Sequence, residues 1–399
     1  MSQPIRVGIT HGDINGIGYE VILKALDGEG MTEICTPVLF GYHAVAEKCR
    51  RQLGMEEMHL FRVPSPSAAQ EGKINVVEVG DEVPPLSPGN ITPEAGAASV
   101  AALDAAVEAL KNGEIDVLVT APICKENVQT GEFHFPGHTE YLEAAIGEGA
   151  KARMILFDDN VRVALVSTHL PISKVAEAVT TESVGDAIDS LNATLRRDFG
   201  IVRPRIAVLS LNPHAGDGGL LGSEEQEIII PTILDRREKG VIVFGPYPAD
   251  GFFALGDYRK FDGIVAMYHD QGLAPFKTLA GERGVNFTAG LPFIRTSPDH
   301  GTAFSIAWKG EADPTSMREA IYKAIDLYRR RSAYDESAAN PLKKYVSEKP
   351  DKGERQDRAP KEKKTPAPQG DARPQENKPR QEREPKNEPQ QSQPTQTEQ

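Results

Sequence analysis

Short apolar runs alternate with helical patterns along most of this chain, and this alternation limits the folds that it can adopt. Apolar residues at 6–10, 115–120, 206–211 and 263–267 have the length and content of buried strands. Helical periodicity follows several of them, for example at 19–26. Strands that alternate with helices usually pair in parallel and are covered by helices on both faces. The sequence therefore predicts an α/β fold.

Three histidines each follow a predicted strand within a few residues: His169, His214 and His269. The carboxyl ends of parallel strands meet at one edge of a sheet, so these imidazoles could bind one divalent metal ion. Three aspartates lie in comparable loops: Asp217, Asp250 and Asp270. The alternative is that each histidine only caps a strand or hydrogen-bonds a loop. Their equivalent positions favour the metal site.

The segment 261–295 carries cations and an amide after its strand. Lys277, Asn286 and Arg295 suit a phosphate or carboxylate better than a core. His138 and Thr139 stand at a predicted helix N-terminus, where free backbone N–H groups favour an anion, although capping alone would explain Thr139. We therefore expect a pocket for an anionic metabolite.

The other histidines give weaker signals. His11, His43, His59 and His134 are expected at the surface or in loops. His300 lies in a loop that could hold a cofactor or simply turn. A strand is expected over 303–308 and a last helix over 316–330.

Composition excludes several classes of protein. The formal net charge of -13 argues against nucleic-acid binding through the folded body. No apolar run approaches the roughly 20 residues of a membrane helix, and the start has no signal-peptide pattern. The 3 cysteines are too few for a disulfide framework, which is typical of a reducing compartment. We expect a cytoplasmic protein with a disordered, charged, Pro- and Gln-rich tail at 346–399.

Five motifs, in this order along the chain, resemble those of the 4-hydroxythreonine-4-phosphate dehydrogenase family of vitamin B6 synthesis. They read GHTE, THLP, NPHAG, PAD and YHDQG, and they begin at Gly137, Thr168, Asn212, Pro248 and Tyr268. The resemblance implies two α/β/α domains of the isocitrate and isopropylmalate dehydrogenase type, with the active site in the cleft between them.

The resemblance also implies where these domains lie. Residues 1–130 and 284–345 would form a discontinuous domain on the NAD side. Residues 131–283 would form the second domain, on the metal and dimer side. The loop at 299–302 would lie against the adenosine of NAD, which accounts for the absence of a Rossmann glycine fingerprint.

The resemblance assigns roles to particular residues. The implied metal ligands, in a site shared across a homodimer interface, are His169, His214 and His269. The implied substrate-binding residues are His138, Thr139, Lys277, Asn286 and Arg295. The implied cofactor-binding residues are Asp299, His300, Gly301 and Thr302. The resemblance does not name the general base, and we expect a nearby group to serve, with Asp250, Asp270 and Lys277 as the candidates.

The implied reaction is the oxidation of 4-phosphohydroxy-L-threonine by NAD, or by NADP in its place, with zinc, magnesium or cobalt. The product, 2-amino-3-oxo-4-phosphooxybutanoate, would decarboxylate to 3-amino-2-oxopropyl phosphate on the way to pyridoxine 5'-phosphate. Ile14, Asn15 and Cys124 depart from the usual family motifs and leave substrate preference open. The alternatives are a related dehydrogenase for erythronate or threonate phosphate, a histidine-ligated metallohydrolase, and a non-catalytic anion-binding protein.

Overall fold

The computed structural model describes residues 4–27, 30–129, 134–135, 137–146, 149 and 151–341. The chain divides after Leu342 into two units, and every described residue belongs to the first. The tail predicted at 346–399 lies outside the described residues. The division of the folded part into two domains at 130/131 and 283/284 stays a prediction.

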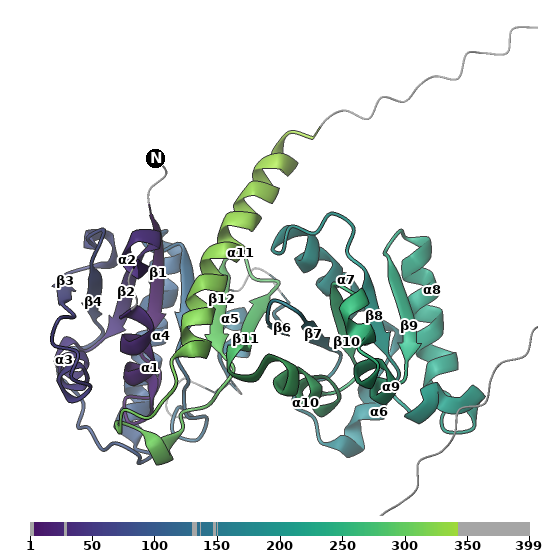
Figure 1. The fold of residues 1–399 in the computed structure, drawn as a ribbon, viewed down its shortest axis with the longest axis horizontal. Helices are drawn as coiled ribbons and strands as arrows, with labels where there is room; N and C mark the ends of the chain where they lie inside the picture. Colours follow the sequence, from purple (N-terminus) through teal and green to yellow (C-terminus); the bar gives the residue numbers. More distant parts are fainter. Residues whose placement is uncertain are drawn as a thin grey trace, which may run out of the picture. The chain divides into compact units, whose positions relative to one another are not determined.

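Twelve strands of the described chain form one sheet, in the order β3-β4-β2-β1-β5-β12-β11-β6-β7-β10-β8-β9 (Figure 1). The strands are β1 (Ile5–Thr10), β2 (Cys35–Gly41), β3 (Leu60–Val63), β4 (Ile74–Glu78), β5 (Val117–Thr120), β6 (Arg153–Phe157), β7 (Arg162–Leu165), β8 (Ile206–Leu209), β9 (Val243–Tyr247), β10 (Gly263–Ala266), β11 (Val285–Ala289) and β12 (Ile294–Pro298).

The sheet is mixed, whereas the sequence predicts parallel strands. β11 is antiparallel to both of its neighbours, β12 and β6, and β6 is antiparallel to β7. The strands that precede the three histidines, β7, β10 and β8, are adjacent and parallel, as expected. Neither β11 nor β12 is predicted from the sequence. Each is a short segment that mixes polar and apolar residues, and its pairing in the sheet depends on strands that are distant in sequence.

Helices connect and cover these strands. They are α1 (Gly18–Leu26), α2 (Met31–Ile34), α3 (His43–Gln52), α4 (Pro93–Lys111), α5 (His138–Ile146), α6 (Val175–Ala178), α7 (Thr181–Arg197), α8 (Ile230–Glu238), α9 (Ala249–Ala254), α10 (His269–Ala280) and α11 (Thr315–Ala339). Short turns of other helix types are η1 (Pro66–Ala68), η2 (Ile172–Lys174), η3 (Pro213–Gly219), the π-helix η4 (Glu225–Ile229), η5 (Asp257–Lys260), η6 (Gly281–Arg283) and η7 (Phe304–Ile306). Among the described helices, none is long and apolar enough to cross a bilayer.

β10 shows how helices cover both faces of the sheet. Val265 packs in one apolar cluster with Leu191 of α7. Ile264 packs in another with Leu273 and Phe276 of α10. Successive residues of a strand point to opposite faces, so α7 and α10 lie on opposite sides of β10. The predicted α/β fold is thereby confirmed.

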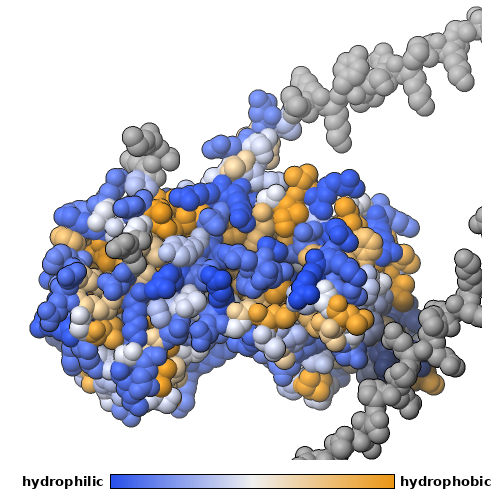
Figure 2. Space-filling model, in the orientation of Figure 1, coloured by the Kyte–Doolittle hydropathy of each residue, from blue (hydrophilic) through white to orange (hydrophobic). Residues whose placement is uncertain are grey.

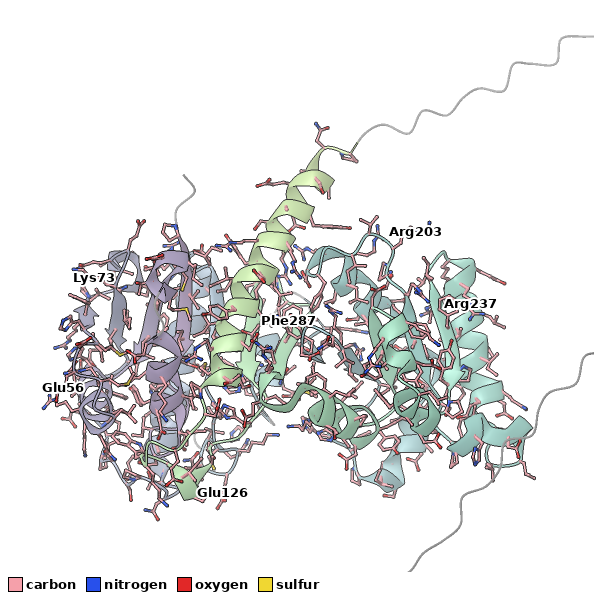
Figure 3. All side chains as sticks on the ribbon, viewed as in Figure 1. Glu56, Lys73, Glu126, Arg203, Arg237 and Phe287 are labelled. Atoms are coloured by element: carbon pink, nitrogen blue, oxygen red, sulfur yellow. The ribbon has the colours of Figure 1, made fainter. Side chains whose placement is uncertain are left out.

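Three aromatic rings join β6, β11 and the segment just after α7 within the core. The rings of Phe157 and Phe199 lie 5.1 Å apart, and Phe287 contacts both of them. Phe287, labelled in Figure 3, is fully buried on β11. Replacing such a residue by Ala typically costs about 3–5 kcal/mol. The antiparallel strand β11 is therefore anchored by its own side chain as well as by its neighbours.

Two sequence expectations near the C-terminus need correction. Residues 303–308 are not a strand, because Ala303 and Trp308 have φ angles of 45° and 62° and Phe304–Ile306 form a 3-10 turn. Trp308 is instead held by a hydrogen bond from its Nε1 to the backbone oxygen of Ile14 at 3.0 Å. The last helix extends past the predicted Arg330 to Ala339.

His11 is also placed differently from the surface position that we expect. It is fully buried, with its ring stacked on Tyr19 at 5.2 Å and its Nδ1 donating to the carbonyl of Gly12 at 2.6 Å. Burial lowers the pKa of His11 to about 4, so the ring is neutral. The expectation holds for His59 and His134, which are exposed.

Candidate active site

One cavity of about 300 Å³ receives side chains from β5, α5, β11, β12 and α10; we call it the Arg295 cavity. It gathers all five residues expected to bind an anionic substrate: His138, Thr139, Lys277, Asn286 and Arg295. These positions span more than 150 residues of sequence. The structure therefore brings them together, while their role in binding stays a prediction.

Arg295 supplies a buried positive charge to this cavity. Its side chain is 2% exposed, and its guanidinium donates to the hydroxyls of Thr120 (from Nε, 3.1 Å) and Thr288 (from Nη1, 2.9 Å). Burial lowers the pKa of Arg295 to about 9, and the charge of Glu140 opposes that shift. The group is still a cation at neutral pH, but these hydroxyl partners carry no negative charge. A buried cation whose hydrogen-bond partners are neutral hydroxyls is costly, so the site favours an anion in direct contact with it.

Three other buried polar atoms at the cavity have no hydrogen-bond partner within the described chain: Nε2 of His138, Oδ1 of Asn286 and Nε2 of His300. Burial, and then the charges of Arg295 and Lys125, lower the pKa of His138 well below its usual value. A neutral imidazole can accept or donate a hydrogen bond at Nε2 according to its tautomer. Unpartnered buried atoms are rare in folded proteins, and three in one cavity indicate a ligand site.

The loop after β12 forms another wall of the Arg295 cavity. Asp299, His300 and Gly301 line it, whereas Thr302 does not and instead accepts a hydrogen bond from the backbone of Ile17 at 3.0 Å. Asp299 pairs with Lys277, with 2.9 Å between Oδ1 and Nζ. The candidate base Lys277 is thus tied to the loop expected to bind the cofactor.

His169 and His269 face each other at the ends of β7 and β10. Their ring centres lie 6.0 Å apart at an interplanar angle of 42°. Nδ1 of His269 donates to Oδ1 of Asp270 at 2.7 Å, which leaves Nε2 as the free nitrogen of that ring. Burial and the charge of Lys125 lower the pKa of His169, which favours the uncharged form of its ring, the form that can coordinate a metal.

A second cavity of about 580 Å³ lies beyond the ends of β8 and β9; we call it the His214 cavity. His214, Asp250 and Asp270 line it, and all three are exposed. His169 lines the Arg295 cavity, so the two histidines belong to different cavities of the chain. In the described part of one chain, no group of three or more His, Cys, Asp or Glu residues is placed to hold a metal ion.

The sequence reasoning missed three residues that line the Arg295 cavity and one, Thr288, that holds Arg295 from behind it. Thr120 and Thr288 hold Arg295, while Lys125 and Glu140 carry charges into the cavity. Thr120 and Lys125 follow the rule that located the histidines, because they stand at and just after the end of β5. Thr288 gives no such signal, since β11 itself is not evident from the sequence.

Comparison with known proteins gives matches over most of the chain. The family model of pyridoxal phosphate biosynthetic protein PdxA matches residues 33–324. A 4-hydroxythreonine-4-phosphate dehydrogenase of Bacteroides thetaiotaomicron is 52% identical over 350 residues, covering 88% of this chain and 96% of the relative. A D-threonate 4-phosphate dehydrogenase of Cupriavidus necator is 40% identical, covering 82% and 98%. The crystal structure of 4-hydroxythreonine-4-phosphate dehydrogenase from Klebsiella pneumoniae is 35% identical with a TM-score of 0.71, covering 82% and 99%.

Proposed function

This chain belongs to the family of pyridoxal phosphate biosynthetic protein PdxA, and we propose that it oxidises 4-phosphohydroxy-L-threonine with a nicotinamide cofactor, which we take to be NAD. The product would be 2-amino-3-oxo-4-phosphooxybutanoate, which decarboxylates to 3-amino-2-oxopropyl phosphate. The observation that supports an anionic substrate most strongly is the buried guanidinium of Arg295 with two hydroxyl partners. A phosphate would place a negative charge in direct contact with the guanidinium and accept hydrogen bonds from it.

Binding of the substrate phosphate can be assigned to the Arg295 cavity. Arg295, Thr139 and Asn286 line one cavity with His138, whose Nε2 is free to bond a ligand oxygen. Lys277 is exposed enough to leave Asp299 and turn towards a second anionic group, because its side chain is 50% exposed. These residues would fix the substrate so that its hydroxyl-bearing carbon faces the cofactor.

The cofactor would lie along the wall made by Asp299, His300 and Gly301. His300 presents a buried, unpartnered Nε2 there, which suits a hydrogen bond to a ligand. When bound, the nicotinamide ring accepts the hydride. Lys277, paired with Asp299 next to this wall, is one candidate to take the hydroxyl proton. Asp250 and Asp270, in the His214 cavity, are the others.

The metal would be held first by His169 and His269. Their ring centres lie 6.0 Å apart, and imidazole nitrogens are ligands that a divalent ion such as zinc would use there. A divalent ion bound there would lower the pKa of the substrate hydroxyl. His214 is the third proposed ligand. Because it lines the other cavity of the same chain, we propose that the site is completed across a homodimer interface.

Exposed apolar side chains near the histidines support this dimer. Leu170 and Ile172 follow His169 and are 47% and 73% exposed, and Leu220 follows the His214 turn at 79%. On the face drawn in Figure 2, apolar residues form small groups between polar ones. Exposed apolar side chains beside an incomplete site are typical of a surface that a second subunit covers.

The reaction itself provides the test. Purified protein is mixed with NAD, a divalent metal and 4-phosphohydroxy-L-threonine, and the nicotinamide absorbance of NADH is followed. We expect NADH to form and a chelator to stop it. No NADH with any phosphorylated substrate would contradict the proposal, and turnover without added nicotinamide cofactor would favour a metallohydrolase.

The second candidate is a dehydrogenase for D-threonate 4-phosphate or 4-phosphoerythronate. The 40% identical Cupriavidus necator relative supports it, because it covers the chain to almost the same extent. These substrates have a hydroxyl where 4-phosphohydroxy-L-threonine has an amino group. NADH formation with the hydroxy acids, and none with the amino acid, would establish the second candidate.

A further inference from the structure

The turn that carries His214 has an unusual backbone. His214, Ala215 and Asp217 have φ angles of 54°, 54° and 42°, and the glycines between and after them are also positive. Side chains on L-residues disfavour this left-handed region, and consecutive residues rarely occupy it. A conformation of this kind persists only when the surrounding structure holds it.

Glu225 is the group that holds the start of this turn. Its carboxylate is 1% exposed and accepts hydrogen bonds from the backbone N–H of Leu211 and of Asn212, both at 2.8 Å. It also accepts from Nδ2 of Asn212 at 2.9 Å. Glu225 begins the π-helix η4, a rare element that often occurs at functional sites. The carboxylate is thus fixed by its helix and fixes the chain just before His214.

Gly216 brings the left-handed turn directly against the same carboxylate. A Cβ atom on Gly216 would lie 2.6 Å from Oε2 of Glu225, so only glycine allows this approach. Gly222 closes the turn in the same way, since its Cβ would lie 2.4 Å from Nδ2 of Asn212. The two glycines and Asn212 therefore pack the turn around Glu225.

The same network reaches the helix that carries His269. Oε1 of Gln271 accepts from the backbone N–H of Met267 at 2.7 Å, and its Nε2 donates to the carbonyl of Ser210 at 2.6 Å. The hydroxyl of Ser210 donates to the carbonyl of Asn212 at 2.9 Å. A continuous series of hydrogen bonds thus joins the end of β10, before His269, to the end of β8, before His214.

We propose that Glu225 is a positioning residue, which sets the His214 turn in a fixed orientation relative to the element carrying His269. This inference rests on the proposed function for what His214 binds, but the positioning itself is a property of the chain. Glu225 would act through Asn212 and Gly216 and would touch neither substrate nor cofactor. A carboxylate serving only to cap a helix would leave the properties of His214 unchanged when it is replaced.

The test compares Glu225→Ala and Glu225→Gln with Glu227→Ala, an exposed position on the same helical segment. Cobalt(II) is titrated into each full-length protein, and the visible spectrum and dissociation constant are recorded. We expect Glu225→Ala to weaken cobalt binding at least 10-fold and to change the spectrum. Glu225→Gln should recover part of the affinity, because one amide oxygen can still accept from both backbone N–H groups. Glu227→Ala should bind cobalt as the wild type does. The KM for NAD should be the same in all three variants as in the wild type.

Hydrogen exchange of residues 211–222 supplies a readout that does not depend on metal or catalysis. Lost protection there in Glu225→Ala is the expected result, and unchanged protection with unchanged cobalt binding would overturn the inference. Should Glu225→Ala fail to fold, Gly216→Ala disturbs the same contact from the other side and should give the same changes.

Wild-type protein that binds cobalt but forms no NADH would contradict the proposed function and leave the positioning role intact. If the wild type binds no cobalt, the hydrogen exchange of residues 211–222 alone decides whether Glu225 positions the turn.

Discussion

The two cavities of this protein differ in how their polar groups are satisfied. At the Arg295 cavity, a buried guanidinium has hydroxyl partners and three buried polar atoms lack any partner in the described chain. At the His214 cavity, Glu225, Asn212 and Gln271 are joined by hydrogen bonds to one another or to the backbone. The first region leaves bonds open for a ligand, and the second uses its bonds to hold a strained turn.

Buried polar groups can therefore either bind a ligand or fix the conformation of the chain. Unpartnered groups cost stability until a ligand pairs with them, whereas paired groups stabilise the conformation they fix. Substitutions in the two regions should therefore have opposite signatures. In the Arg295 cavity they should reduce activity and spare stability, and behind the His214 turn they should reduce stability.

The largest effect is expected for Arg295→Met. Loss of the buried cation should lower kcat/KM on the order of 100-fold or more, because a buried charged hydrogen bond to a ligand is worth about 2–5 kcal/mol. The free energy of unfolding should stay the same or rise, because the folded variant no longer contains a buried charge at this position. Steady-state kinetics and urea unfolding measure both. Arg203→Met, at an exposed arginine labelled in Figure 3, is the control. Loss of stability in Arg295→Met would show that this cation supports the fold, as the groups behind the His214 turn do.

Gln271→Ala tests the opposite signature behind the His214 turn. It removes the partners of the Met267 N–H and the Ser210 carbonyl, so the free energy of unfolding should fall by about 1–3 kcal/mol. The KM for NAD should not change. Urea unfolding is the measurement, with Thr278→Ala on the exposed side of the same helix as control, expected within about 0.5 kcal/mol of wild type. Equal stability of Gln271→Ala and wild type would show that the network does not support the turn.

Asp299→Asn separates binding from stability within the Arg295 cavity. The pair with Lys277 is half exposed on the lysine side, so its loss should change the free energy of unfolding by less than about 1 kcal/mol. The KM for NAD should rise roughly 10-fold, equivalent to about 1.4 kcal/mol of cofactor binding. Asp335→Asn, which breaks the Arg197 pair elsewhere, should leave that KM unchanged. A normal KM in Asp299→Asn would remove Asp299 from the cofactor site.

The pH dependence of stability should depend on His138. Its pKa in the folded protein lies below the ordinary value of 6.5. As the pH is lowered, the unfolded chain therefore takes up a proton on His138 before the folded protein does. The free energy of unfolding should therefore fall as the pH is lowered from 6.5 towards the folded-state pKa, and His138→Gln should reduce that fall. Inorganic phosphate should also reduce it, because an anion offsets the charge of Arg295. His59→Gln is the control, and an unchanged pH profile in His138→Gln would contradict this account.

Much of the candidate site follows from local sequence. His169, His214 and His269 do stand after three adjacent parallel strands, because strand length and apolar content can be read locally. The chemistry of Lys277, Asn286 and Arg295 predicts an anion site, and these side chains do meet in one cavity. The left-handed turn at His214 left a signal that the sequence reasoning did not use, namely three glycines among residues 216–219.

Local patterns of residues are enough to predict the α/β class, most strand positions and the kinds of side chain at the strand ends. Three features become evident only in the folded chain: β11 and β12 insert between β5 and β6, His11 is buried, and Arg295 contacts Thr120 across 175 positions of sequence. The physical reason is range: periodicity and turn chemistry act over a few residues, whereas burial and pairing depend on which distant segments pack together.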